Sequence, residues 1–261
     1  MTITAALIKE LRNRTGIAMM ECKKALELTH WDIDKAIEEL RKKWLAKAAK
    51  KSDREALEWG IKIISEWSKS FIISVSCETD FLAKSDRFKS MLDEVVNFLR
   101  NNGSDSKSSA QSMIETNYSL EMWENLQIKD YEIIEWWTTA NYVHSNSKLA
   151  AVVVAQNWAD EEKLKQVAMH ITASNPEYLS PEEISSEVVE KEKSIQLEMM
   201  KNDPKMQGKP DEVLLKIIEG KMWKFKSEIS LLEQAFVISP DIRVKDFLGT
   251  TQLAWFKRYS I

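Results

Sequence analysis

Glycine, histidine and cysteine are scarce in this chain of 261 residues, and their scarcity excludes several kinds of protein. Its two cysteines, Cys22 and Cys77, lie far apart and form no Cys-x-x-Cys pair. They cannot supply the disulfide framework of a small secreted protein or a cysteine-based zinc site. We therefore expect a protein of a reducing compartment.

The spacing of the 6 glycines and 3 histidines argues against a nucleotide pocket, catalysis by a metal ion and a Ser-His-Asp triad. No glycines are spaced as G-x-G-x-x-G or as G-x-x-x-x-G-K-[ST], so the backbone arrangements that cradle phosphates are missing. His30, His144 and His170 form no zinc-binding pattern and give no support to a Ser-His-Asp triad. The carboxylates are numerous but form no visible acid–base constellation. We expect no cofactor, no metal site and no catalytic chemistry of the chain's own.

Long apolar runs are also missing. No window approaches about 18 uninterrupted apolar residues, and segment 1–16 carries charges within an amphipathic pattern, unlike a signal peptide. The formal net charge of -4 argues against a general nucleic-acid-binding protein. We expect a cytoplasmic protein that binds neither a membrane nor a nucleic acid directly.

One segment departs from the even balance of charge. Residues 41–51 contain Arg41 and five lysines with no acidic residue. The run could contact phosphates or an acidic protein surface, or it could be the solvated face of a helix. We favour the solvated face because charged helix faces are common.

The first part of the chain has the pattern of a three-helix unit. Apolar residues recur at helical spacing over 7–11, 19–26 and 33–44. Gly16 is a natural C-cap for the first helix, and Asp32 suits the N-cap of the third. Because a unit of about 45 residues is marginal on its own, we expect a docking module followed by a basic helical linker.

The next part alternates between strand and helix patterns. A period of two predicts an antiparallel hairpin with strands near 57–63 and 71–77. A helical stripe runs from Phe88 to Leu99, and the serine-rich segment Gly103–Ser112 is interpreted as a flexible connection. Two β-rich runs and a helix follow, at 131–142, 148–156 and 164–171. This order indicates an α+β fold with antiparallel sheets.

The clearest local signal is Ser180-Pro181-Glu182-Glu183, which places Ser at the N-cap, Pro at N1 and Glu at N3 of a new helix. Two apolar stripes, separated by breaks at 202–204 and 208–210, then predict an αα-hairpin arm. A two-helix arm buries little surface by itself, so we expect it to contact a partner or a second copy of the chain. The segment 234–261 returns to a strand–helix–strand pattern that completes the sheet.

Several separate segments, in the same order, resemble the bacterial elongation factor Ts family. The segments that carry the resemblance are Leu7–Arg12, Thr15–Gly16, Met19–Leu26, Cys77–Lys84, Ala168–Ile171, Pro176–Tyr178, Val189–Glu192, Gly208–Pro210, Glu219–Met222 and Leu232–Gln234. They are spread over all but roughly the stretch from Lys107 to Glu135, and an ordered set of this kind is far more specific than any single short motif.

The resemblance implies an α+β fold in four units. These are a ubiquitin-associated-like three-helix docking domain with its linker (1–52), an N-terminal core subdomain (53–140), a C-terminal core subdomain (141–179 and 227–261) and a helical hairpin arm of the coiled-coil dimerisation type (180–226). It also implies a guanine nucleotide exchange factor for elongation factor Tu, the GTPase that delivers aminoacyl-tRNA to the ribosome. The nucleotide would belong to the partner, which agrees with the missing phosphate cradle.

By resemblance, the motif Thr79-Asp80-Phe81-Leu82 contacts the GTPase and displaces the elements that position its Mg²⁺. Phe81 would be the wedge, with Thr79 and Asp80 holding the loop and Leu82 replacing the usual valine. Further partner contacts are expected at Arg12, Met19, Met20 and His144.

Simpler interpretations stand beside these. Phe81 taken alone would be read as a core aromatic residue, His144 could equally be a loop histidine on the surface, and Met19 and Met20 could pack in a core. The chain departs from the family at two places where the family usually has glycine. Trp44 favours a continuous helix at the hinge, and Ser145–Ser147 replaces the usual glycines of a loop. The alternative function is that of a partner that binds or stabilises the GTPase without driving exchange.

Overall fold

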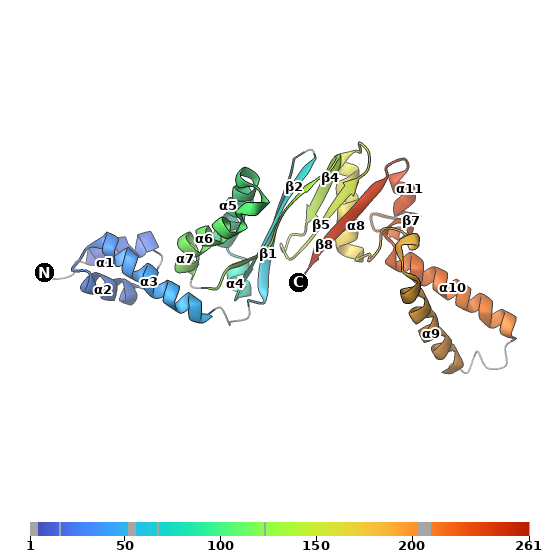
Figure 1. The fold of residues 1–261 in the computed structure, drawn as a ribbon, viewed down its shortest axis with the longest axis horizontal. Coiled ribbons are helices and arrows are strands. Elements are labelled where there is room, and N and C mark those ends of the chain that lie inside the picture. Colours follow the sequence, from blue (N-terminus) through green and yellow to red (C-terminus); the bar gives the residue numbers. More distant parts are fainter. Residues whose placement is uncertain are drawn as a thin grey trace.

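The computed structural model describes residues 5–15, 17–51, 56–66, 68–122, 124–202 and 210–260. Figure 1 shows an elongated molecule with three parts in a row: a helical unit toward the N-terminus, a body with antiparallel sheets, and a two-helix arm at the far end. The mixture of helices with small antiparallel sheets confirms the predicted α+β class.

The N-terminal unit contains α1 (Ala5–Thr15), α2 (Met19–Leu28) and α3 (Ile33–Lys51). Its core consists of Leu11, Ile17, Cys22, Ala25, Leu26, Ala36 and Leu40. Asp32 accepts a hydrogen bond from the Lys35 N–H at 3.1 Å, which confirms its predicted capping role. The continuous helix expected through Trp44 is also confirmed. Gly16, the predicted C-cap of α1, lies outside the described residues.

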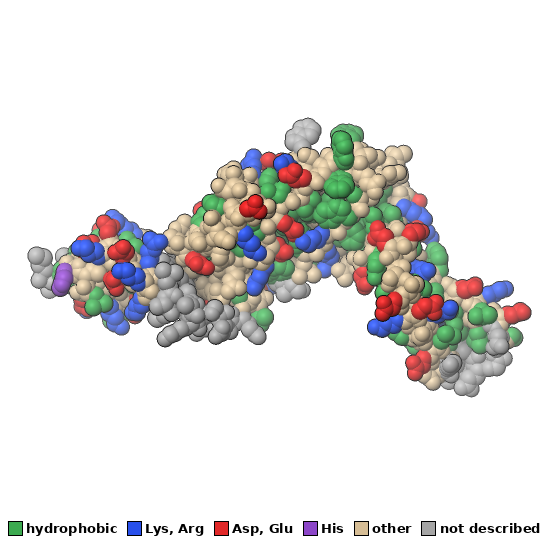
Figure 2. Space-filling model, in the orientation of Figure 1, with side chains coloured by type: hydrophobic (Ala, Val, Ile, Leu, Met, Phe, Trp, Pro, Cys, Tyr) green, Lys and Arg blue, Asp and Glu red, His purple; other side chains and the backbone are tan. Residues whose placement is uncertain are grey.

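The described part of the basic run is interleaved with acidic partners. Lys42 pairs with Glu39 at 3.1 Å, and Lys43 reaches Glu21 on α2 at 2.6 Å. On the face shown in Figure 2, basic and acidic side chains lie among one another over this unit. This arrangement supports the interpretation of a solvated helix face.

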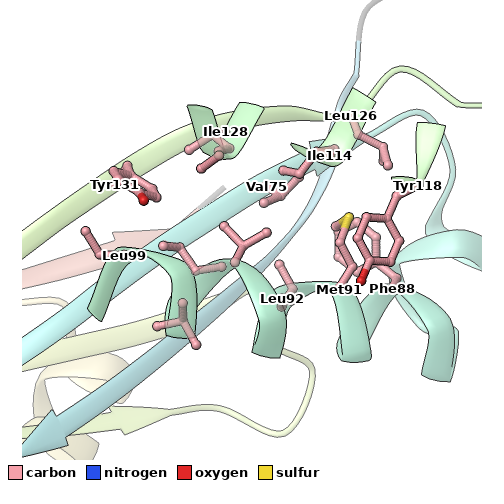
Figure 3. Close-up of a cluster of buried hydrophobic side chains, with 14 of the residues drawn as sticks. Val75, Phe88, Met91, Leu92, Leu99, Ile114, Tyr118, Leu126, Ile128 and Tyr131 are labelled. Carbon is pink, nitrogen blue, oxygen red and sulfur yellow. The ribbon is translucent and has the colours of Figure 1, made fainter. Parts of the chain in front are cut away.

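The first sheet contains β1 (Glu58–Glu66), β2 (Lys69–Cys77) and β3 (Gln127–Glu135), in that order and antiparallel. The predicted hairpin is therefore confirmed. Side chains of α5 (Asp86–Asn102) and α6 (Lys107–Asn117) converge on β2 and β3 in the main core of the body (Figure 3). The packing of α5 on β1 is close, since a Cβ added at Gly60 would lie 2.7 Å from a ring carbon of Phe88.

The interpretation of Gly103–Ser112 as a flexible connection is wrong. Ser104–Ser106 forms a 3₁₀ turn, and α6 begins at Lys107. Ala110 and Ile114 are fully buried in the core of the first sheet. This burial stabilises a helix whose serines give it little intrinsic propensity. A short helix, α7 (Ser119–Met122), follows.

The second sheet contains β4 (Thr138–Val143), β5 (Leu149–Ala155) and β8 (Leu253–Ser260), with α8 (Glu161–Ser174) packed against it. The β-rich run predicted over 131–142 is two strands in different sheets, because β3 ends at Glu135 and the chain crosses to the second sheet at Trp136 and Trp137. β4 extends across the expected subdomain boundary between residues 140 and 141.

An apolar cluster and one carboxylate join the two sheets. The cluster contains Ile61, Ile63, Ile72, Ile134, Ala150, Val152, Val154 and Tyr259. Glu132 on β3 accepts hydrogen bonds from the Tyr259 hydroxyl and the Lys257 ammonium, both on β8 and both at 2.7 Å. Burial, together with the nearby Glu132 carboxylate, raises the pKa of Tyr259, so its hydroxyl remains a donor.

The arm consists of α9 (Ser186–Asn202) and α10 (Asp211–Ile229), which meet through Met200, Ile218 and Met222. The helix start predicted at Ser180 is wrong in position. Pro181–Glu183 forms a single 3₁₀ turn, and the buried Ile184 is extended, so α9 begins only at Ser186. The Glu183 carboxylate folds back onto the Leu179 N–H at 3.0 Å. The segment with the cap pattern therefore forms a short turn ahead of the arm, without a cap hydrogen bond from the Ser180 side chain.

The chain returns from the arm to the body through β6 (Ala235–Phe236), β7 (Ser239–Arg243) and α11 (Val244–Leu248). The predicted strand–helix–strand pattern is confirmed, and β8 completes the second sheet beside β5. In the described ranges, no helix is both long enough and apolar enough to span a membrane.

Candidate functional site

The motif Thr79–Leu82 lies where the last strand of the hairpin turns into a helix. Cys77 ends β2 in the core, and the next residues form the short helix α4 (Asp80–Ala83). Thr79 is its N-cap, because the hydroxyl oxygen accepts the Leu82 N–H at 3.2 Å. Ser85 then caps α5 by accepting the Phe88 N–H at 3.2 Å. Two successive caps fix a sharp corner in the chain.

This corner points one large aromatic side chain into solvent. Phe81 is 84% exposed, the highest value among the exposed large hydrophobic residues of the described chain. Leu82 and Ala83, on the same turn, pack against the core of the first sheet. Phe81 is therefore not a core aromatic residue, and the helix beneath it is anchored from the other side.

Charged side chains flank Phe81. Asp80 pairs with Lys84 across one helical turn at 2.7 Å. The hydrogen bond from Lys84 lowers the pKa of Asp80, and the same contact raises the pKa of Lys84. Lys148, which pairs with Glu58 at the start of β1, lowers the pKa of Asp80 further. Phe81 thus follows Asp80 directly, on a turn that carries an ion pair and lies within the electrostatic influence of Lys148.

A carboxylate that sequence reasoning missed holds the segment before Phe81. Glu124, half-buried ahead of β3, accepts the backbone N–H groups of Glu78 and Thr79 at 2.8 and 3.0 Å. It also accepts the Thr79 hydroxyl proton. In return, the Glu78 carboxylate accepts the Asn125 N–H at 2.9 Å. The only signal in the sequence is a Glu-Asn pair before a strand, which is too common to identify such a contact.

The Cys77 thiol is unreactive although it lies next to the motif Thr79–Leu82. Its thiol is buried and donates to the Thr79 carbonyl oxygen at 3.4 Å. Burial, with smaller contributions from Glu124 and Glu58, raises the pKa of the Cys77 thiol to about 12. A protonated thiol of this kind is a packing group.

The loop between β4 and β5 is tied to the same region of the body. His144 is exposed, and its Nδ1 lies 3.1 Å from the Tyr142 hydroxyl oxygen. Ser147 has a left-handed backbone with φ 55, a conformation that glycine adopts more readily. The Ser147 carbonyl accepts the Ile61 N–H at 2.8 Å, which fixes the loop against β1. Lys148 then connects this loop to the charges beside Phe81.

The other predicted contact residues lie in the N-terminal unit. Arg12 is exposed on α1, while Met19 and Met20 at the start of α2 are 51% and 63% exposed. The two methionines are therefore not core residues of this unit. These three side chains belong to a different packed unit from Thr79–Leu82, because the N-terminal unit and the first sheet each have a hydrophobic core of their own.

The described residues contain no cluster of three or more His, Cys, Asp or Glu side chains that could hold a metal ion. The motif itself is convex: an exposed ring on a capped turn, with ion pairs beside it. Such a shape fits insertion into a groove of another macromolecule better than enclosure of a small molecule.

Comparisons with known proteins agree with one another. The family model described as "Elongation factor TS" matches residues 78–261, which include the motif and His144. A curated protein named "Elongation factor Ts" from Haemophilus influenzae (strain PittEE) is 42% identical over 249 residues, which is 94% of this chain and 86% of the relative. Proteins of the same name from Shewanella loihica and Spiroplasma citri are 43% and 38% identical, each over 95% of this chain and over 86% and 88% of the relative.

Proposed function

This chain belongs to the elongation factor Ts family, and from that premise we propose that it is a guanine nucleotide exchange factor for elongation factor Tu. It would act during translation elongation, in the cytoplasm, by promoting the release of GDP. No covalent bond is made or broken by the factor, so it is not an enzyme in the chemical sense. The observation that carries the mechanism is the 84% exposed Phe81 on an anchored turn.

Exchange requires differential binding to two states of the partner. The factor must bind the nucleotide-free GTPase more tightly than the GDP-bound GTPase, and GDP must weaken the binding of the factor by the same ratio. A GTPase holds GDP through its phosphate loop and a Mg²⁺ that neutralises phosphate charge. Insertion of Phe81 between elements that position this Mg²⁺ would loosen the nucleotide without a contact to its base.

The other contacts have supporting roles in this proposal. Thr79 and Asp80 shape the turn, and Leu82 anchors it to the core. His144 lies on a loop connected to the same charges, through Lys148. Arg12, Met19 and Met20 would hold the partner through the N-terminal unit, where two exposed methionines offer an adaptable apolar surface.

The arm is proposed as a self-association surface. Beyond the contacts between its helices it exposes Ile195, Met199, Leu215 and Trp223, at 43%, 57%, 59% and 59%. Exposed apolar side chains on a two-helix arm are covered when a second copy or a partner docks there. We propose dimers of the chain, or dimeric complexes with the GTPase, through this arm.

The decisive experiment measures release and binding together. Stopped-flow release of a fluorescent GDP analogue from elongation factor Tu should accelerate with increasing concentration of this chain and reach a plateau. Calorimetric titration in the presence and absence of GDP should show that GDP weakens the complex. Tight binding that is insensitive to GDP, with an unchanged release rate, would instead identify a stabilising partner without exchange activity.

A further inference from the structure

We infer that Glu124 is a positioning residue for exchange, acting through Thr79 to hold the turn that presents Phe81. The inference rests on the proposed function and concerns a residue outside the motif itself. Glu124 lies 45 positions from Thr79 in the sequence, yet it accepts hydrogen bonds from both the backbone and the hydroxyl of that residue.

The geometry uses both oxygens of the Glu124 carboxylate as acceptors. One oxygen of Glu124 accepts the N–H groups of Glu78 and Thr79, and the other accepts the Thr79 hydroxyl proton. An ionised carboxylate has only acceptors, and its hydrogen bonds are charge-assisted. A glutamine side chain at this position keeps one oxygen and turns an NH₂ donor toward one of the two sides.

The hydroxyl of Thr79 transmits this arrangement to α4. A hydroxyl has a single proton, and here that proton is given to Glu124. Its lone pairs are therefore left for the Leu82 N–H, the hydrogen bond that caps the first turn of α4. The orientation of the cap thus depends on Glu124, and Phe81 lies between the two residues that the cap joins.

Phe81 needs such external support. At 84% exposure it has almost no packing of its own to fix its position in the free protein. Its backbone is held on one side by the cap and on the other by Leu82 and Ala83 against the core. Holding a binding group in its bound geometry before contact reduces the entropic cost of association.

The experiment compares Glu124→Gln with the wild-type chain and with Glu135→Gln. Glu135 lies at the opposite end of β3 and pairs with Lys69, so it serves as the matched control. The maximum rate of GDP release from elongation factor Tu should fall about tenfold for Glu124→Gln, equivalent to about 1.4 kcal/mol. The half-saturating concentration should change by less than about threefold, because the rest of the interface is intact. The control should match wild type.

A double variant separates positioning from direct contact. In a Phe81→Ala background, Glu124→Gln should cause no further loss beyond about twofold, because the side chain that it positions is gone. Thr79→Val should also slow release and Thr79→Ser should restore it, which keeps the inference testable if Glu124→Gln unfolds in urea at a much lower midpoint.

The outcomes are distinct. A wild-type chain that fails to accelerate release overturns the proposed function, and with it the exchange role of Glu124. An active wild-type chain with a fully active Glu124→Gln variant overturns this inference alone. A full tenfold further loss in the Phe81→Ala background also overturns it, because Glu124 would then act independently of Phe81.

Discussion

Removing the exposed ring of Phe81 should slow GDP release while leaving the free energy of unfolding nearly unchanged. Phe81 is 84% exposed, so nearly the whole side chain is available to a partner and little of it supports the fold. Full burial of a phenylalanine side chain contributes about 1.5–3 kcal/mol, and 84% of this is about 1.3–2.5 kcal/mol. Phe81→Ala should therefore lower the GDP release rate by roughly 10- to 70-fold. The free energy of unfolding should change by less than about 0.5 kcal/mol, as for other surface positions.

The assay is stopped-flow release of a fluorescent GDP analogue, with urea unfolding of each variant measured in parallel. Trp158→Ala is the matched control, because Trp158 is 83% exposed and lies beyond the C-terminal end of β5. Lys148, which lowers the pKa of Asp80 beside Phe81, lies at the N-terminal end of the same strand. The seven residues of β5 separate these ends by about 23 Å. Equal release rates for Phe81→Ala and wild type would refute the wedge mechanism, and so would an equal loss in Trp158→Ala.

Three further outcomes are expected. Ser147→Gly should raise the free energy of unfolding by about 1 kcal/mol because it relieves a left-handed backbone, while Ser145→Gly should give no gain, and urea denaturation compares the two. Burial lowers the pKa of His170 below its usual 6.5, so the unfolded chain binds a proton more readily than the folded chain. The free energy of unfolding should therefore keep the whole His170 contribution above pH 6.5 and decrease below it by up to about 1.4 kcal/mol per pH unit. His170→Gln should remove this dependence in urea titrations at several pH values. Deletion of residues 181–225 should convert dimers to monomers in light scattering, and an unchanged association state would reject self-association through the arm.

Local patterns predicted the elements that are amphipathic over their whole length. The hairpin, α5 and α10 each carry apolar residues at regular spacing that pack in a core, so their period identifies them. The helix that begins within Gly103–Ser112 was not predicted, because the segment is rich in serine and has too few apolar residues to show a helical period. Ala110 and Ile114 are the residues by which this helix packs into the core. At Ser180 a turn does begin where the pattern places a helix start, but the Ser180 side chain makes no cap hydrogen bond, and the chain becomes extended at the buried Ile184.

The centre of the candidate site could be proposed from the sequence, but the contacts that support it could not. Thr79–Leu82 is a contiguous motif, so resemblance could point to it, and the Thr79 cap is a local feature of the same segment. Glu124 is invisible from sequence because its role depends on a hydrogen bond across 45 positions. The break between β3 and β4 was hidden for a related reason, since Trp136 and Trp137 continue a strand-like composition through the point where the chain changes sheets.

The position of β8 affects how the body can fold during synthesis. β5 is an uncharged strand, Leu-Ala-Ala-Val-Val-Val-Ala, held between β4 and β8. About a hundred residues, including the whole arm, separate it from β8, and a ribosome needs roughly 5–20 s to add them. Throughout that interval one edge of β5 lacks its partner, and an unpaired apolar edge is a template for aggregation. The arm, Ser186–Ile229, supplies nearly half of the residues made in this interval, so an insertion into the arm would lengthen the time for which the nascent body carries this hazard.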